Sequence, residues 1–230
     1  MRKFFVLILG LTIILSSLIL LLKSKNNVIE TMAVPVSSRT IIVDAGHGSP
    51  DEGAVGVNGI TEAKLNLKIA LKLKNLLESG GSKVILTRSD DNEIYDESAK
   101  TIAQKKVSDV KNRVKIGNES QADIFVSIHL NKIPQSQYSG WQTFYNNNEK
   151  SKTLATAIQN NLNNTISNDN KRVAKLLTNV YIMKHVEIPI SIVECGFLSN
   201  KQESENLQND EYQTKLAWGI YDGINEYFEK

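Results

Sequence analysis

Histidine is scarce in this sequence, and two of its histidines lie where chemistry can take place. The chain holds three histidines, and both His47 and His129 come at or shortly after the end of a short apolar run. His47 lies between two glycines, so the backbone can bend closely around it and leave the imidazole exposed. Alone, such a histidine is more often an ordinary loop residue. The two together offer a pair of imidazole ligands for a metal ion.

Two glutamates accompany these histidines. Glu62 falls in the first turn of an expected helix, where the helix dipole alone favours a carboxylate. With the two imidazoles, Glu62 gives the His₂Glu set of catalytic zinc sites, which leave a fourth position open. Glu194 ends the apolar run ISIVE and can serve as a general base beside such a site. Spacing alone does not prove the set, because no H-E-x-x-H helix fixes its geometry.

The elements that must position these residues alternate along the chain. Runs of β-branched and apolar residues predict strands, and apolar residues at helical spacing predict helices. Strands separated by helices indicate an α/β fold with a mostly parallel sheet flanked by helices, and ligands bind beyond the carboxyl ends of such strands. His47, His129 and Glu194 all fall there. The strands are predicted at 40–43, 83–87, 122–129, 141–145, 180–183 and 188–194, and the helices at 61–79, 101–118, 151–166 and 210–228.

The N-terminal segment predicts one transmembrane helix before this domain. Phe4 to Leu22 carries no charge, and a helix needs about 20 apolar residues to cross a bilayer. We therefore expect residues 1–22 to be a membrane anchor or uncleaved signal, 23–39 a linker and 40–230 the catalytic domain. Basic residues flank the apolar run on both sides, so they do not decide its orientation.

Composition and charge exclude several classes of protein. The chain has 27 Lys and Arg residues and 25 Asp and Glu residues, a net charge of +2. This small excess does not indicate a nucleic-acid-binding protein. The one cysteine, Cys195, excludes an intramolecular disulfide and a cysteine-rich metal site. With no further base beside it, Cys195 is expected to be a packing residue.

Five motifs, taken in order, resemble the zinc-dependent N-acetylmuramoyl-L-alanine amidases of the amidase 3 family. The resemblance covers essentially all of residues 40–230. It implies one Zn²⁺ held by His47, Glu62 and His129, with Glu194 as the catalytic acid/base. The motifs are VDAGHG-x-x-D-x-GAVG at 43–56, GITEAKLNL at 59–67, DIFVSIHLN at 123–131, SGWQTFY at 139–145 and IVECGFLSN at 192–200.

Four further residues have weaker functional interpretations. Asp44 and Asn131 flank the ligand histidines, where each could accept a bond from an imidazole N–H or simply cap a turn. Arg172 and Lys175 match a basic stretch of the family and could bind carboxylates of a stem peptide, or form a solvated basic turn.

The resemblance is greatest to the CwlD-type sporulation and germination amidases of this family. It implies a membrane-anchored enzyme outside the cytoplasm, in the forespore intermembrane space. There it would cleave the amide between N-acetylmuramic acid and L-alanine in spore cortex, a step toward the muramic-δ-lactam needed for germination. Division-associated members of the family carry a long insertion over the zinc after the third motif, whereas here only residues 132–139 separate Asn131 from Gly140. The resemblance therefore implies an open site, which suggests control by expression or by an accessory protein partner. The alternatives are a zinc peptidase that cuts within the stem peptide and a non-catalytic peptidoglycan-binding regulator.

Overall fold

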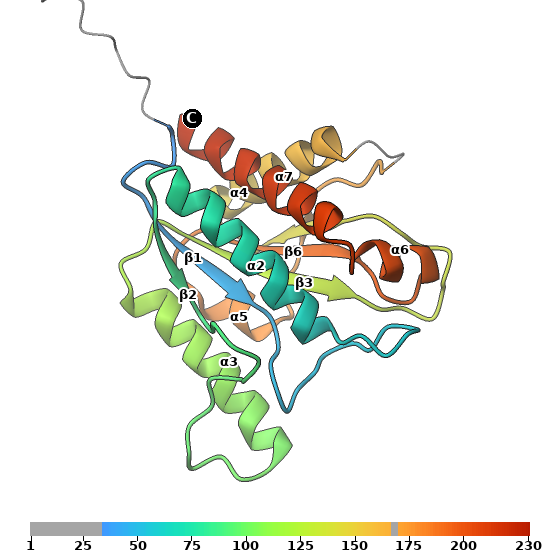
Figure 1. Cartoon of the computed structure of the whole chain (residues 1–230). Coiled ribbons are helices and arrows are strands. Elements are labelled where there is room, and N and C mark those ends of the chain that lie inside the picture. The colour runs from blue at the N-terminus through green and yellow to red at the C-terminus, as the bar shows by residue number, and fades with distance from the viewer. Residues whose placement is uncertain (1–33, 167–169) are drawn as a thin grey trace, which may run out of the picture. The chain divides into compact units, whose positions relative to one another are not determined.

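A six-stranded mixed sheet forms the centre of the domain in this computed structural model, which describes residues 34–166 and 170–230 (Figure 1). The strand order is β2-β1-β3-β6-β4-β5. The first four of these strands are mutually parallel, β4 is antiparallel to β6, and β5 is parallel to β4. The strands are β1 (Thr40–Ala45), β2 (Lys83–Leu86), β3 (Ile124–Asn131), β4 (Gln142–Tyr145), β5 (Lys175–Leu176) and β6 (Ile190–Phe197).

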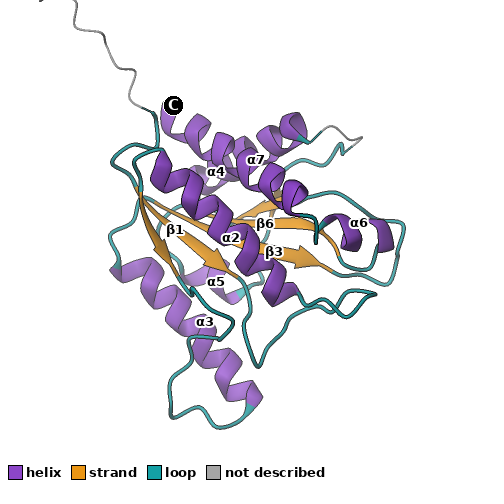
Figure 2. Cartoon of the chain, in the orientation of Figure 1, coloured by secondary structure: helices purple, strands orange, loops and turns teal. Residues whose placement is uncertain are grey.

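Helices cover both faces of the sheet (Figure 2). Helices α2 (Glu62–Ser79), α4 (Glu149–Thr165) and α7 (Asp210–Glu229) pack on one face through a core that includes Leu65, Leu154 and Ile220. Helices α3 (Ile102–Glu119) and α5 (Tyr181–His185) pack on the other face, where Phe125 and Ile182 belong to a second core. The short helix α6 (Lys201–Asn206) follows β6. The predicted α/β class is thus confirmed, with a mixed sheet.

The segment predicted as a strand at 180–183 is instead the helix α5. Val180 is the N-cap of this helix, and Ile182 and Met183 are buried in the second core. A short apolar run bounded by polar residues does not distinguish a strand from one buried helical turn. The structure also contains β5, a two-residue edge strand that the sequence pattern did not predict.

The predicted membrane anchor at 1–22 lies outside the described residues. Within residues 34–166 and 170–230, no helix is both long and apolar enough to cross a membrane. The end of the predicted linker is packed on the domain, because Val36 is fully buried and its carbonyl accepts a hydrogen bond from Ser82. The ordered domain therefore includes a few residues before β1.

Candidate active site

His47 lies in the glycine-rich loop that follows β1 and has a left-handed backbone with φ of 61°. Its Nδ1 lies 3.0 Å from Oδ2 of Asp51, and its carbonyl accepts a hydrogen bond of 2.8 Å from Arg113. The preceding Gly46 also has a steric role. A Cβ on Gly46 would lie 2.2 Å from the imidazole of His129, so only glycine leaves room for that ring.

Glu62 is the first residue of α2, and its carboxylate is almost entirely buried. Oε2 accepts a hydrogen bond from the backbone N–H of Ala54, and Oε1 accepts one from that of Leu130. Oε1 also lies 3.0 Å from Nδ1 of His129 and 3.4 Å from Nε2 of His47. Burial raises the pKa of Glu62, but its contacts with the two imidazoles outweigh this and hold the pKa well below its usual range.

The same contacts change the pKa of His47. Burial lowers this pKa, but hydrogen bonds and charge interactions with Glu62 and Asp51 raise it to about 9. The site is therefore a tightly coupled group of two imidazoles and a buried carboxylate. A metal cation would complement the Glu62 carboxylate, and its binding would displace the imidazolium proton.

Glu194 lies beside this group because of strand register. It pairs directly with His129 across β3 and β6. In β6, Ile190 and Ile192 belong to the core under α3 and α5, so Glu194 points to that same face. Its Oε2 is buried and has no hydrogen-bond partner among the described residues. Burial and the charge of Glu62 raise the pKa of Glu194 to about 7.

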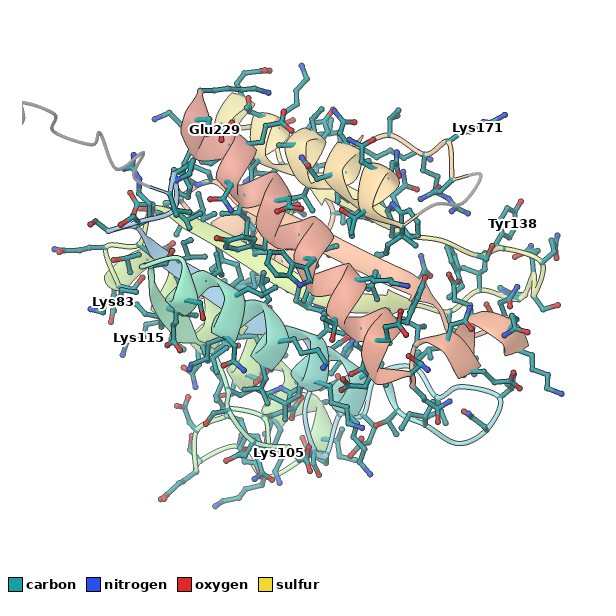
Figure 3. The ribbon with its side chains drawn as sticks, turned by 45° about the horizontal axis from the view of Figure 1, so that its top comes forward. Lys83, Lys105, Lys115, Tyr138, Lys171 and Glu229 are labelled. Carbon is teal, nitrogen blue, oxygen red and sulfur yellow. The ribbon has the colours of Figure 1, made fainter. Side chains whose placement is uncertain are left out.

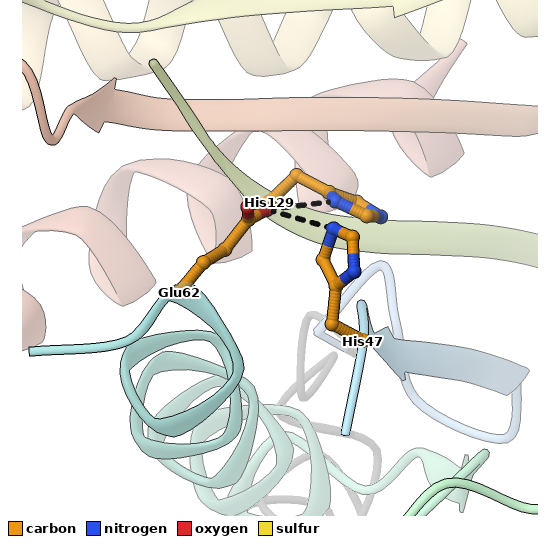
Figure 4. A group of neighbouring side chains, drawn as sticks. All are labelled: His47, Glu62 and His129. Atoms are coloured by element: carbon orange, nitrogen blue, oxygen red, sulfur yellow. Dashed lines mark hydrogen bonds and ion pairs between the residues drawn. The ribbon is translucent and has the colours of Figure 1, made fainter. Parts of the chain in front are cut away.

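His47, Glu62 and His129 have the arrangement needed to bind a zinc ion. One ligand atom from each of His47, Glu62 and His129 can be chosen so that all lie within 4.8 Å of one another (Figure 4). Two imidazole nitrogens and one carboxylate oxygen are a donor set typical of catalytic zinc. The neighbouring buried Glu194 oxygen without a partner suits a reaction in which a water molecule or substrate enters this space. The residues present thus fit the metal that the sequence predicts.

A cavity of about 280 Å³ adjoins the cluster and lies between α3 and the segment leading into α5. His47, His129 and Glu194 line one part of it. Its remaining walls combine charged side chains with an apolar surface, as expected for a binding site with a few convergent polar groups. The charged residues include Asp51, Glu93, Lys106, Asp109 and Arg113, and the apolar ones are Val110, Leu177, Val180, Ile182 and Ile192.

Asp44 and Asn131 were predicted to lie beside the histidines, and they occupy different environments in the structure. Asp44 is buried and accepts hydrogen bonds from Thr87, Ser127 and Arg113. It therefore joins β1 to β3 and α3. Asn131 ends β3, where its carbonyl accepts from Leu198. Among the described residues, the side chains of Asp44 and Asn131 form no hydrogen bond with either imidazole.

The predicted basic pair lies away from the cavity wall. Arg172 stacks over the ring of Phe197 at 5.1 Å and donates to the carbonyl of Ser139, so it holds two loops together. Lys175 is exposed on the edge strand β5. The neighbouring Lys171 points outward, as Figure 3 shows. The basic segment thus forms part of the surface rather than the lining of the cavity.

The interpretation of the sequence missed Asp51, the carboxylate that contacts His47. The available signal was its position four residues after the histidine within one glycine-rich motif. The interpretation also missed Arg113, which comes from α3 and is far from Asp44 and His47 in sequence. No local pattern marks that residue, because only the packing of α3 on the sheet brings it to the site.

A family model described as N-acetylmuramoyl-L-alanine amidase matches residues 41–226. The chain belongs to this amidase 3 family and has the peptidoglycan amidase activity that defines it. Its relatives include the germination-specific N-acetylmuramoyl-L-alanine amidase of Bacillus subtilis. The two are 37% identical over 210 residues, which cover 89% of this chain and 86% of the relative.

Solved structures agree with this family and define the subgroup. The CwlD amidase from Clostridioides difficile, solved in complex with the GerS lipoprotein, matches with a TM-score of 0.81 and 45% identity. The match covers 84% of this chain and 99% of that one. The catalytic domain of CwlV from Bacillus (Paenibacillus) polymyxa matches with a TM-score of 0.71 and 31% identity, over 83% and 98% of the two chains. The predicted resemblance to CwlD-type amidases is confirmed.

Proposed function

We propose that this amidase cleaves the bond between N-acetylmuramic acid and L-alanine with one zinc ion held by His47, Glu62 and His129. Glu194 is the acid/base of the reaction. The observation that carries this proposal is the buried Glu194 oxygen without a partner, directly across the strands from His129 and lining the same cavity.

The role of Glu194 follows from its position and protonation. A zinc ion supplies an activated water nucleophile and polarises the substrate carbonyl. Glu194, whose pKa is raised by burial, accepts a proton from the attacking water at its free oxygen. As the bond between carbonyl carbon and nitrogen breaks, Glu194 returns that proton to the leaving nitrogen of L-alanine. The products are the lactyl carboxylate of muramic acid and a peptide with a free L-alanine amine.

We further propose that the substrate is the peptidoglycan of spore cortex and that the product leads toward muramic-δ-lactam. The germination-specific relative in Bacillus subtilis supports this role. Such a substrate requires the catalytic domain to act outside the cytoplasm. The apolar residues 4–22 would then anchor it to a membrane facing the intermembrane space of the forespore.

An accessory protein partner is also part of the proposal. The CwlD amidase of Clostridioides difficile was solved in complex with the GerS lipoprotein. The match to this chain covers 99% of that amidase. A partner of this kind would bind the catalytic domain of this chain and regulate its site.

The test uses the purified full-length chain with cortex-type peptidoglycan, and it measures bound zinc together with the released peptides. We expect about one zinc per chain and peptides that begin with L-alanine. Glu194→Gln should keep the metal and lose the activity. Peptides that begin at a later stem residue would instead identify a peptidase. Bound zinc without cleavage, also after addition of a cognate lipoprotein, would favour a binding protein.

A further inference from the structure

The two nitrogens of the His47 imidazole face different carboxylates. Nδ1 lies 3.0 Å from Oδ2 of Asp51, and Nε2 lies 3.4 Å from Oε1 of Glu62. An imidazole that donates its Nδ1–H to a carboxylate keeps the lone pair on Nε2 for a metal ion. The contact with Asp51 therefore selects the nitrogen that faces Glu62 and His129.

Asp51 is itself held at both oxygens. Oδ1 lies 2.8 Å from Nζ of Lys106 and accepts a hydrogen bond of 3.3 Å from the backbone N–H of Gly53. The backbone carbonyl of Asp51 accepts from the N–H of Gly48, which closes a turn over residues 48–51, directly after His47. The Asp51 side chain is only 16% exposed. With Oδ1 and Oδ2 engaged on opposite sides, the carboxylate has one orientation toward the imidazole.

Helix α3 supplies two contacts to this arrangement. Lys106 and Arg113 are about two helical turns apart, which places them on the same face of α3. Arg113 donates to the carbonyl of His47 at 2.8 Å, and Lys106 pairs with Asp51. One helix thus fixes the backbone of His47 directly and its ring through Asp51. The left-handed backbone of His47 makes such support necessary, since few non-glycine residues adopt it.

We infer that Asp51 is a positioning residue that fixes the Nδ1–H form of His47, and that Lys106 anchors Asp51 from α3. This inference rests on the proposed function, in which His47 binds zinc. The contrary interpretation is that Lys106 and Asp51 form a surface ion pair of little consequence, because Lys106 is 50% exposed and exposed pairs contribute little to stability. The two interpretations differ in what they predict for zinc affinity.

Asp51→Asn is the sharpest variant, because it keeps the shape and changes the hydrogen bonding. If its oxygen remains with Lys106 and Gly53, its amide turns toward His47 and favours the form with hydrogen on Nε2, which cannot bind the metal. We expect a 10–100-fold loss of zinc affinity, the range typical for partners of metal-binding histidines. Lys106→Met keeps Asp51 and should cause a smaller loss. Lys111→Met, at an exposed lysine of the same helix, is the matched control.

The experiment measures zinc affinity of the full chain by competition with a chelator, and follows the Nδ1 proton of His47 by NMR in the zinc-loaded chain. In the parent and in Lys111→Met this proton should be protected from exchange with water, and in Asp51→Asn the protection should be lost. Equal zinc affinity of the parent and Asp51→Asn would overturn the inference and leave the proposed function standing. Absence of zinc binding by the parent would overturn both. If Asp51→Asn does not fold, equal affinities of Lys106→Met and Lys111→Met would remove the role of Lys106.

Discussion

His129 and Glu194 are direct neighbours across the central pair of parallel strands, β3 and β6. Both side chains line the same cavity, on the face covered by α3 and α5. This relationship depends on register, because a slip of one residue in β6 would turn Glu194 to the opposite face. In β6, Ile190 and Ile192 pack in the core on the face of Glu194, and Val193 and Cys195 pack in the core on the opposite face.

Glu194→Gln should slow the reaction strongly without removing the metal. Glutamine keeps the size of the side chain but cannot accept and return a proton, and general acid–base catalysis contributes about 10²–10⁴-fold to rates. We expect kcat to fall by at least about 100-fold with unchanged zinc content. Glu205→Gln, at an exposed glutamate of α6, is the control. A Glu194→Gln enzyme with the parent rate would assign the proton transfer to another group.

Gly46→Ala should damage the zinc site while the rest of the fold remains. The added Cβ would lie 2.2–2.3 Å from ring atoms of His129, so the imidazole must move. We expect weaker zinc binding and lower activity, with a circular dichroism spectrum like that of the parent. The control is Gly59→Ala, where a Cβ meets nothing within 4 Å but φ is 80°. That control should lose about 1 kcal/mol of stability and keep its zinc affinity, and equal zinc affinities for the two variants would contradict the steric argument.

Arg113→Met should destabilise the domain strongly. Arg113 is buried and pairs with both Asp44 and Asp109. Although burial raises the pKa of Asp44, Arg113 and hydrogen bonds from Ser127 and Thr87 lower it below its usual value. Removing the guanidinium leaves two buried carboxylates without their partner, which costs about 3–5 kcal/mol. Chemical denaturation measures this change.

A surface ion pair provides the comparison for Arg113. Lys74 and Glu78 lie 2.6 Å apart on α2 and are both partly exposed. Lys74→Met should therefore change the free energy of unfolding by about 0.5 kcal/mol or less. Similar losses for Lys74→Met and Arg113→Met would show that the buried cluster contributes no more than a surface pair.

Glu203 should make stability depend on pH. Its buried carboxylate accepts hydrogen bonds from the backbone N–H groups of Gly140 and Phe197, yet burial raises its pKa from 4.5 to about 7. Between these two values the folded chain binds more protons at this site than the unfolded chain. Its contribution to stability is therefore full below about pH 4.5 and is lost as the pH rises toward about 7.

Comparison with Glu203→Gln isolates this effect from those of Glu194 and Glu93, whose pKa values burial also raises. The stability of the parent relative to Glu203→Gln should decline by about 1–3 kcal/mol between pH 4.5 and pH 7.5. Denaturation curves of both proteins at several pH values, in the same metal state, measure the difference. A constant difference across this range would show that the pKa of Glu203 is not raised.

The family, the α/β class and the residues of the candidate zinc site were all predictable from the amino-acid sequence. These features are local, because the glycine-flanked His47, the helix start at Glu62 and the strand ends at His129 and Glu194 each lie within a short motif. Apolar periodicity also predicted the long helices to within a few residues, and α2 and α7 each bury one stripe of apolar residues.

How these motifs come together, and which residues support them, became visible in the folded domain. Residues 180–183 form a helical turn rather than a strand, because they cover the second core instead of extending the sheet. From α3, Lys106 contacts Asp51 and Arg113 contacts His47. The sequence of this helix does not indicate that it supports the site. Its position follows from burial against the sheet, a long-range interaction that local sequence patterns do not encode.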